Sequence, residues 1–172
     1  EGKVLNKVSL DEALKLDRVA SEIVDTLSEY FILTGSVTLA EQGTVYRPSE
    51  NQVHDLDWQS PYGTEESIKL FESIYPDAKK VRVIEDENGI YRTDTWVVPP
   101  AGYTIESLVL SGKTNKIVSY DLVDENGDII STYDGKTESF SGDVEAKVID
   151  IFTQSDRSEE HTSELQSRQY LV

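Results

Sequence analysis

The chain has 172 residues, a formal net charge of −17 and no cysteine. So acidic a surface repels phosphate backbones, which argues against a protein that binds nucleic acid non-specifically. Without cysteine there is no disulfide framework and no thiolate metal site, which is compatible with a cytoplasmic protein. No apolar run approaches the roughly 20 residues that cross a membrane, so no membrane partner is expected.

The first half of the chain predicts helices that alternate with short strands. Ser9 and Glu12 have the spacing of a capping box, and apolar residues follow at helical spacing. A Pro at position 76 ends the last helix of this half. The predicted elements are a helix at 9–29, a buried strand at 31–34, a short helix at 36–42, a polar loop at 44–53, a strand at 54–59 and a helix at 64–75 capped by Thr64.

The second half of the chain predicts mainly strands. The sequence Asp-Glu-Asn-Gly occurs twice, at 86–89 and at 124–127, and Asn-Gly is a strong signal for a tight β-hairpin turn. No linker-like stretch separates the two halves, so we predict one α+β domain over residues 1–156. The predicted strands are 80–85, 90–98, 117–123, 129–133 and 146–152, the last with a short helix as the alternative.

Two features in the first half point to phosphate and metal chemistry. Gly35 and Ser36 stand between a predicted strand and a predicted helix, where free backbone N–H groups and the helix dipole favour a phosphate. Asp55 and Asp57 lie on the next strand, and period-two alternation places both carboxylates on one face, with Leu56 on the other. Two such carboxylates can share Mg²⁺ with substrate phosphates.

This order of features resembles the DNA-polymerase-β-like nucleotidyltransferase superfamily. An apolar strand that ends in Gly35-Ser36, followed by an Asp55-Leu56-Asp57 strand, is similar to the signature of that superfamily. The resemblance implies a mixed or antiparallel sheet with helices on one face, here with β-hairpin insertions. It also implies a third carboxylate from a later strand, for which Asp150 fits best and Asp121 is the competitor.

The resemblance implies a metal-dependent transfer of a nucleoside monophosphate from an NTP to a hydroxyl of a small molecule or a protein. Gly35 and Ser36 would bind the β- and γ-phosphates, and Arg47 is a further candidate for the triphosphate. Asp55, Asp57 and Asp150 would hold Mg²⁺ or Mn²⁺ as metal ligands and catalytic groups. The alternative is a catalytically inactive scaffold or interaction domain of a larger multi-domain protein.

The C-terminal segment, residues 157–172, has a different origin. The run from Arg157 to Ser167 resembles one translated reading frame of a short-read sequencing adapter, as is found in metagenomic data. Such segments are excluded from fold reasoning. We therefore expect a non-native tail after Asp156, a domain truncated at its C-terminus and a native protein that is a longer polypeptide.

We predict that deleting residues 157–172 leaves the stability of the domain unchanged, because no selection shaped this segment to pack on the core. The thermal unfolding midpoints of the full chain and of a chain ending at Asp156 should agree within error. A lower midpoint for the shorter chain would contradict the assignment.

Overall fold

The computed structural model describes residues 17–34, 55–113 and 115–154. In these ranges two helices and two β-sheets confirm the predicted α+β class. Neither helix is long and apolar enough to cross a membrane. The elements are α2 (Arg18–Leu27), β1 (Ile32–Thr34), β2 (Asp55–Gly63), α4 (Thr64–Ile74), β3 (Lys79–Glu85), β4 (Tyr91–Val98), β5 (Thr104–Leu110), β6 (Ile117–Val123), β7 (Ile129–Asp134), β8 (Ser139–Phe140) and β9 (Lys147–Gln154).

The first sheet has five strands in the order β1-β2-β9-β4-β3. The last described strand, β9, lies at its centre, parallel to β2 and antiparallel to β4. Val98 at the end of β4 is the Cα partner of Lys147 at the start of β9. Residues 99–146 therefore leave the sheet and return to it at the neighbouring strand.

The excursion between β4 and β9 forms the second sheet, an antiparallel meander in the order β5-β6-β7-β8. Both predicted hairpins are present: β3 pairs with β4, and β6 pairs with β7. The turn glycines Gly89 and Gly127 have φ values of 69° and 88°, the left-handed region that favours glycine. The Asn-Gly signals were therefore correct, whereas β5 and β8 were not predicted, although the dipeptide Asp134-Gly135 before β8 is a turn signal of the same kind.

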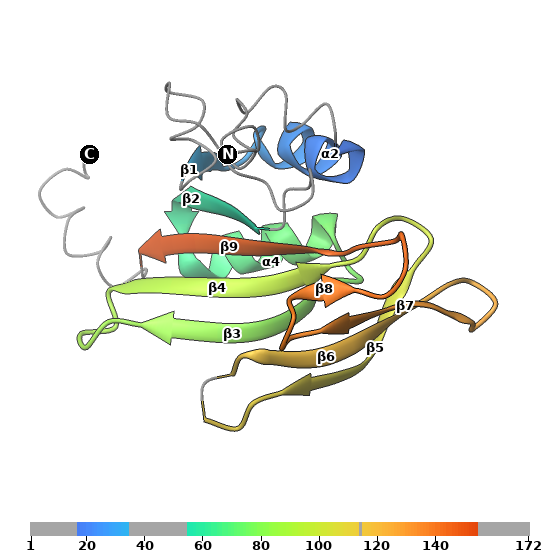
Figure 1. Cartoon of the computed structure of the whole chain (residues 1–172). Coiled ribbons are helices and arrows are strands. Elements are labelled where there is room, and N and C mark those ends of the chain that lie inside the picture. Colours follow the sequence, from blue (N-terminus) through green and yellow to red (C-terminus); the bar gives the residue numbers. More distant parts are fainter. Residues whose placement is uncertain (1–16, 35–54, 114, 155–172) are drawn as a thin grey trace, which may run out of the picture.

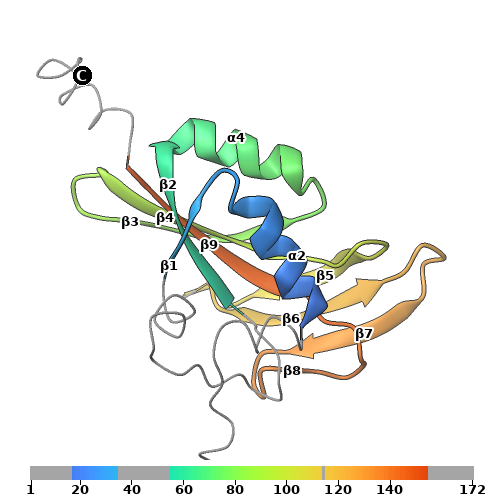
Figure 2. The same cartoon turned by 90° about the horizontal axis from the view of Figure 1, so that it is seen from above.

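The two faces of the first sheet pack against different layers. Figures 1 and 2 show α2 and α4 on one side of it and the second sheet on the other. Ile149 and Ile151 of β9 join the core beneath the helices, together with Trp58. Val148, which points to the opposite face, packs with the second-sheet residue Tyr120. Strand alternation thus divides the apolar core into two clusters.

Three local expectations were wrong. The helix does not run continuously from position 9, because Asp17 is extended and its side chain accepts a hydrogen bond from the Ala20 N–H, which starts α2 at Arg18. Thr64 is the first residue of α4 and not its cap; its hydroxyl contacts Thr153 instead. The strand β1 is an edge strand, so Ile32 is 57% exposed and not buried.

Several predicted features lie outside the described residues. They are the capping box at Ser9, the Gly35-Ser36 turn, the helix at 36–42, the loop with Arg47 and the tail at 157–172. The strand expected at 146–152 is β9, so its helical alternative is wrong.

A buried ion pair joins α2 to the central strand. The Nζ atom of Lys147 lies 2.5 Å from Oδ2 of Asp17, and the two residues are only 2% and 7% exposed. The other carboxylate oxygen of Asp17 caps the helix. Asp17 thus fixes both where α2 begins and where it sits over β9.

We predict that Lys147→Met destabilises the domain by about 3–5 kcal/mol, because it removes the ammonium group that contacts the buried Asp17 carboxylate. The double variant Asp17→Asn/Lys147→Met should recover part of this loss, since Asn still caps a helix and no charge is buried. Urea unfolding gives the free energies. A double variant no more stable than Lys147→Met would show that the buried Asp17 charge is not the cause of the lost stability.

Candidate functional site

A row of polar side chains crosses the face of the first sheet that lies opposite the helices. Strand pairing aligns five Cα atoms across all five strands. Because paired residues point to the same face, their side chains stand side by side. The row consists of Thr34 on β1, Asp57 on β2, Asp150 on β9, Thr95 on β4 and Arg82 on β3.

At the centre of the row, the Asp57 and Asp150 carboxyls meet. The side chain of Asp57 shares a hydrogen bond with Asp150, which requires a proton between them. Loss of hydration, this hydrogen bond and repulsion from the Asp150 and Asp55 charges raise the pKa of Asp57 to about 7. At neutral pH the pair therefore holds a proton for part of the time, and a cation could take the place of that proton.

Two neighbours hold Asp150 in position. The Thr95 hydroxyl donates a hydrogen bond to Oδ1 of Asp150 from the adjacent strand β4. Arg82 Nη2 lies 3.9 Å from the same oxygen, at the limit of an ion pair, and its side chain is 30% exposed. The guanidinium therefore keeps donors free to contact a second anion in the cleft.

Asp55 stands two residues from Asp57 on the same face of β2, opposite Val148 of β9. Its pKa is raised by loss of hydration and by repulsion from Asp150 and Glu138, while Arg82 lowers it. Asp55 thus adds negative potential to the pair, but it does not line the cleft that contains Asp57 and Asp150. The structure brings two of the three predicted carboxylates together and leaves the third beside them.

The cleft above this row has a volume of about 480 Å³ and is open to solvent. The next row along the strands gives it an apolar side that includes Phe152 and Ile84. Tyr91 stacks on Phe152 with ring centroids 5.6 Å apart. The cleft therefore presents an acidic pair, one guanidinium and exposed apolar surface to a ligand.

Arg82 is a site residue that sequence reasoning missed. In a regular strand Lys80 and Arg82 would share one face, but the register shifts between them. Lys80 faces the helix side, where its Nζ lies 2.8 Å from Asp94 and 5.0 Å from the Trp96 ring centroid. Arg82 is thereby turned to the opposite face. Such a β-bulge re-aims a side chain, and no signal in the local sequence announces it.

Of the other predicted site residues, Gly35, Ser36 and Arg47 lie outside the described residues. Asp121, the competitor of Asp150, lies on β6 in the second sheet and accepts a hydrogen bond from Thr132. Leu56 is fully buried beneath the helices, so Asp57 and Leu56 point to opposite faces of β2, as the alternation predicts.

The donor set can be compared with what a divalent cation requires. Within the described ranges no three His, Cys, Asp or Glu side chains are grouped closely enough to hold a metal ion by themselves. Mg²⁺ is, however, commonly held by one or two carboxylates, with water and substrate phosphates as the other ligands. Asp57 and Asp150 fit that kind of shared site.

Comparison with protein-family models, with curated proteins and with solved structures found no match to this chain.

We predict that Asp57→Asn stabilises the domain at neutral and higher pH. The folded-state pKa of about 7 lies above the usual 3.8, so the wild type loses stability as pH rises between these values, when Asp57 must ionise beside Asp150. Asn avoids this charge and can still donate to Asp150. The gain should be about 1 kcal/mol above pH 7, limited by solvent screening, and near zero at pH 4. Parallel pH profiles of unfolding free energy for both proteins would contradict the coupling.

Proposed function

We propose that this protein is a metal-dependent nucleotidyltransferase that moves a nucleoside monophosphate from an NTP to the hydroxyl of a small molecule or protein. The observation that carries the proposal is the in-register pair Asp57 and Asp150 on two parallel strands, facing an open cleft. The resemblance of the Gly35-Ser36 and Asp55-Leu56-Asp57 segments to the polymerase-β-like superfamily supports the same chemistry. An enzyme that consumes NTP is expected in the cytoplasm.

The electrostatics of the pair favour a cation between the two carboxyls. Loss of hydration, the hydrogen bond to Asp150 and repulsion from the Asp150 and Asp55 charges together raise the pKa of Asp57 to about 7, so ionising both carboxyls of the pair is unfavourable. Mg²⁺ or Mn²⁺ would relieve it, held by Asp57 and Asp150 with Asp55 adding negative potential. When bound, such an ion activates the attacking oxygen and stabilises the leaving pyrophosphate.

The other residues of the row have roles that follow from their positions. Thr95 orients Asp150 through its hydroxyl, so that one carboxylate oxygen stays directed at the cleft. Arg82 would contact a phosphate oxygen with the donors that Asp150 does not use. In the transfer, the acceptor oxygen bonds to the α-phosphorus and the bond to pyrophosphate breaks. The acceptor proton passes to an Asp150 oxygen, consistent with general-base catalysis.

A non-catalytic interaction domain is the second candidate. Several apolar side chains of the second sheet are exposed, as expected for a surface that contacts another protein. They are Val109 at 47%, Val118 at 45%, Ile129 at 60% and Ile130 at 39%. In this case the Asp57 and Asp150 pair would bind neither metal nor nucleotide.

We predict that Mg²⁺ with an NTP raises the unfolding midpoint of the wild type. At a hundredfold excess over Kd the stabilisation should be about 2.7 kcal/mol, which corresponds to roughly 5–10 °C for a domain of this size. The double variant Asp57→Asn/Asp150→Asn should lose this response, because both metal-ligating carboxylates are gone. The measurement is thermal unfolding with and without Mg²⁺–NTP.

Asp121→Asn is the matched control, since it removes a half-buried strand carboxylate from the other sheet and keeps an acceptor for Thr132. It should respond to Mg²⁺–NTP as the wild type does. An equal response in all three proteins would mean that the pair binds nothing. The interaction domain would then be the better description.

A further inference from the structure

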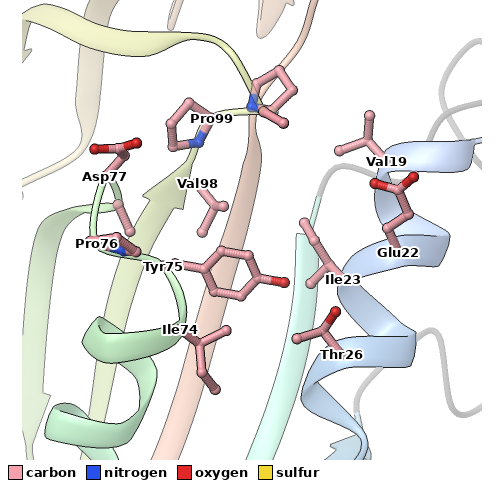
Figure 3. Close-up of a pocket in the computed structure, with 13 residues that line it drawn as sticks. Val19, Glu22, Ile23, Thr26, Ile74, Tyr75, Pro76, Asp77, Val98 and Pro99 are labelled. Atoms are coloured by element: carbon pink, nitrogen blue, oxygen red, sulfur yellow. The ribbon is translucent and has the colours of Figure 1, made fainter.

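A second pocket lies on the helix side of the first sheet, on the face opposite to the polar row that contains Asp57 and Asp150. Figure 3 shows α2 on one side of it, and the turn after α4 and Pro99 across from α2. Its volume is about 280 Å³. The helix contributes a stripe at one-turn spacing: Val19, Glu22, Ile23 and Thr26. The Tyr75 ring stands between the two sides, with its hydroxyl directed at α2 (Figure 3).

The inner surface of this pocket is apolar. Ile23 and Val98 are 4% and 2% exposed and belong to the core beneath the helices. Ile74 packs against the same core, and Pro99 covers the pocket from the turn that follows β4. These walls come from the body of the fold and from a proline, so the apolar part of the pocket is preformed. Such a surface favours an aliphatic or aromatic body of a ligand.

The polar side chains that the structure describes at its edge are carboxylates or hydroxyls. Glu22 on α2 and Asp77 across the pocket are exposed carboxylates. Loss of hydration raises the pKa of Tyr75, with a smaller contribution from the Glu22 charge, and its hydroxyl makes a hydrogen bond with Thr26. None of the lining residues that the structure describes is Lys, Arg or His. Among the residues that the structure describes, the charged groups at the pocket edge are therefore all negative.

The shape and the charge of the pocket together indicate the kind of ligand that it binds. An apolar interior selects a hydrocarbon body, while two carboxylates and the electron-rich face of Tyr75 select a positive charge. The net charge of −17 attracts cations toward the whole molecule. We propose that the pocket between α2 and the Pro99 turn binds a primary ammonium group on an apolar stem, either a small amine or a lysine side chain of a partner.

Three probes that share one stem test the charge requirement. Hexylamine is cationic at neutral pH, hexan-1-ol is neutral and hexanoate is anionic. Calorimetric titration of the full chain should show hexylamine binding about tenfold more tightly than hexan-1-ol, with no detectable hexanoate binding. The hexylamine affinity should fall as salt is added, since exposed charges are screened. Equal binding of all three probes would overturn the proposal.

Charge variants test which carboxylates bind the ammonium group. Glu22→Gln/Asp77→Asn should weaken hexylamine binding about tenfold, roughly threefold for each exposed carboxylate. Asp25→Asn is the matched control, because Asp25 is an exposed acid on the same helix that does not line the pocket. The Asp25→Asn variant should bind hexylamine as tightly as the wild type does. The proposal fails if the double variant and the control bind equally well.

Methyl NMR locates the ligand and separates this site from the acidic row. Hexylamine should shift the methyl signals of Ile23, Ile74 and Val98 and leave Ile84, in the cleft with Asp57, unchanged. Shifts at Ile84 alone would overturn the proposal without bearing on nucleotide binding. A capped lysine, Nα-acetyl-lysine-N-methylamide, separates the two sources. If the capped lysine binds about as tightly as hexylamine, the pocket is assigned to a lysine side chain of a protein. If the capped lysine does not bind, the pocket is assigned to a small amine.

Discussion

The pairing of β9 between β2 and β4 is the constraint on which the rest of the structure depends. The strand closest to the C-terminal end of the described chain enters the middle of the sheet, so β2 and β4 are not hydrogen-bonded to each other. Its Ile149 and Ile151 complete the core beneath the helices, and Val148 joins the core shared with the second sheet. Both apolar clusters therefore depend on β9, a strand whose partner strands are distant in sequence. The position of α2 also depends on β9, through Lys147.

The same pairing creates the charge repulsion between Asp57 and Asp150. Because β2 and β9 are parallel and in register, Asp57 and Asp150 stand directly opposite each other. Two like charges on paired residues destabilise a sheet, and a group with a strongly raised pKa in a cleft is a common sign of a functional site. Thr95 holds Asp150 in this arrangement instead of letting it turn away. A sheet optimised for stability alone would avoid such a pair.

The five-stranded sheet separates two surfaces with different chemistry. The face with Asp57 and Asp150 offers carboxylates beside the Arg82 guanidinium, a combination suited to a metal–phosphate ligand. The helix side offers a smaller pocket with Glu22 and Asp77 and no cation among its described lining residues, which suits an organic cation. The two proposals would give the acidic composition of the chain two distinct local roles. If both sites bind as proposed, each could be blocked without disturbing the other, because a packed core lies between them.

The sequence alone determined the features that rest on local chemistry. Asn-Gly turns specified both hairpins, and the alternation in 55–57 placed Asp57 and Leu56 on opposite faces. Tertiary structure decided the rest. Long-range pairing, and no local signal, selected Asp150 over Asp121 as the neighbour of Asp57. A bulge turned Arg82 into the cleft. Asp17 interrupts the helical pattern expected from position 9, and its carboxylate pairs with Lys147, a residue 130 positions away. Propensity and periodicity act over a few residues, whereas the partners of a strand or of a buried charge are set by the whole fold.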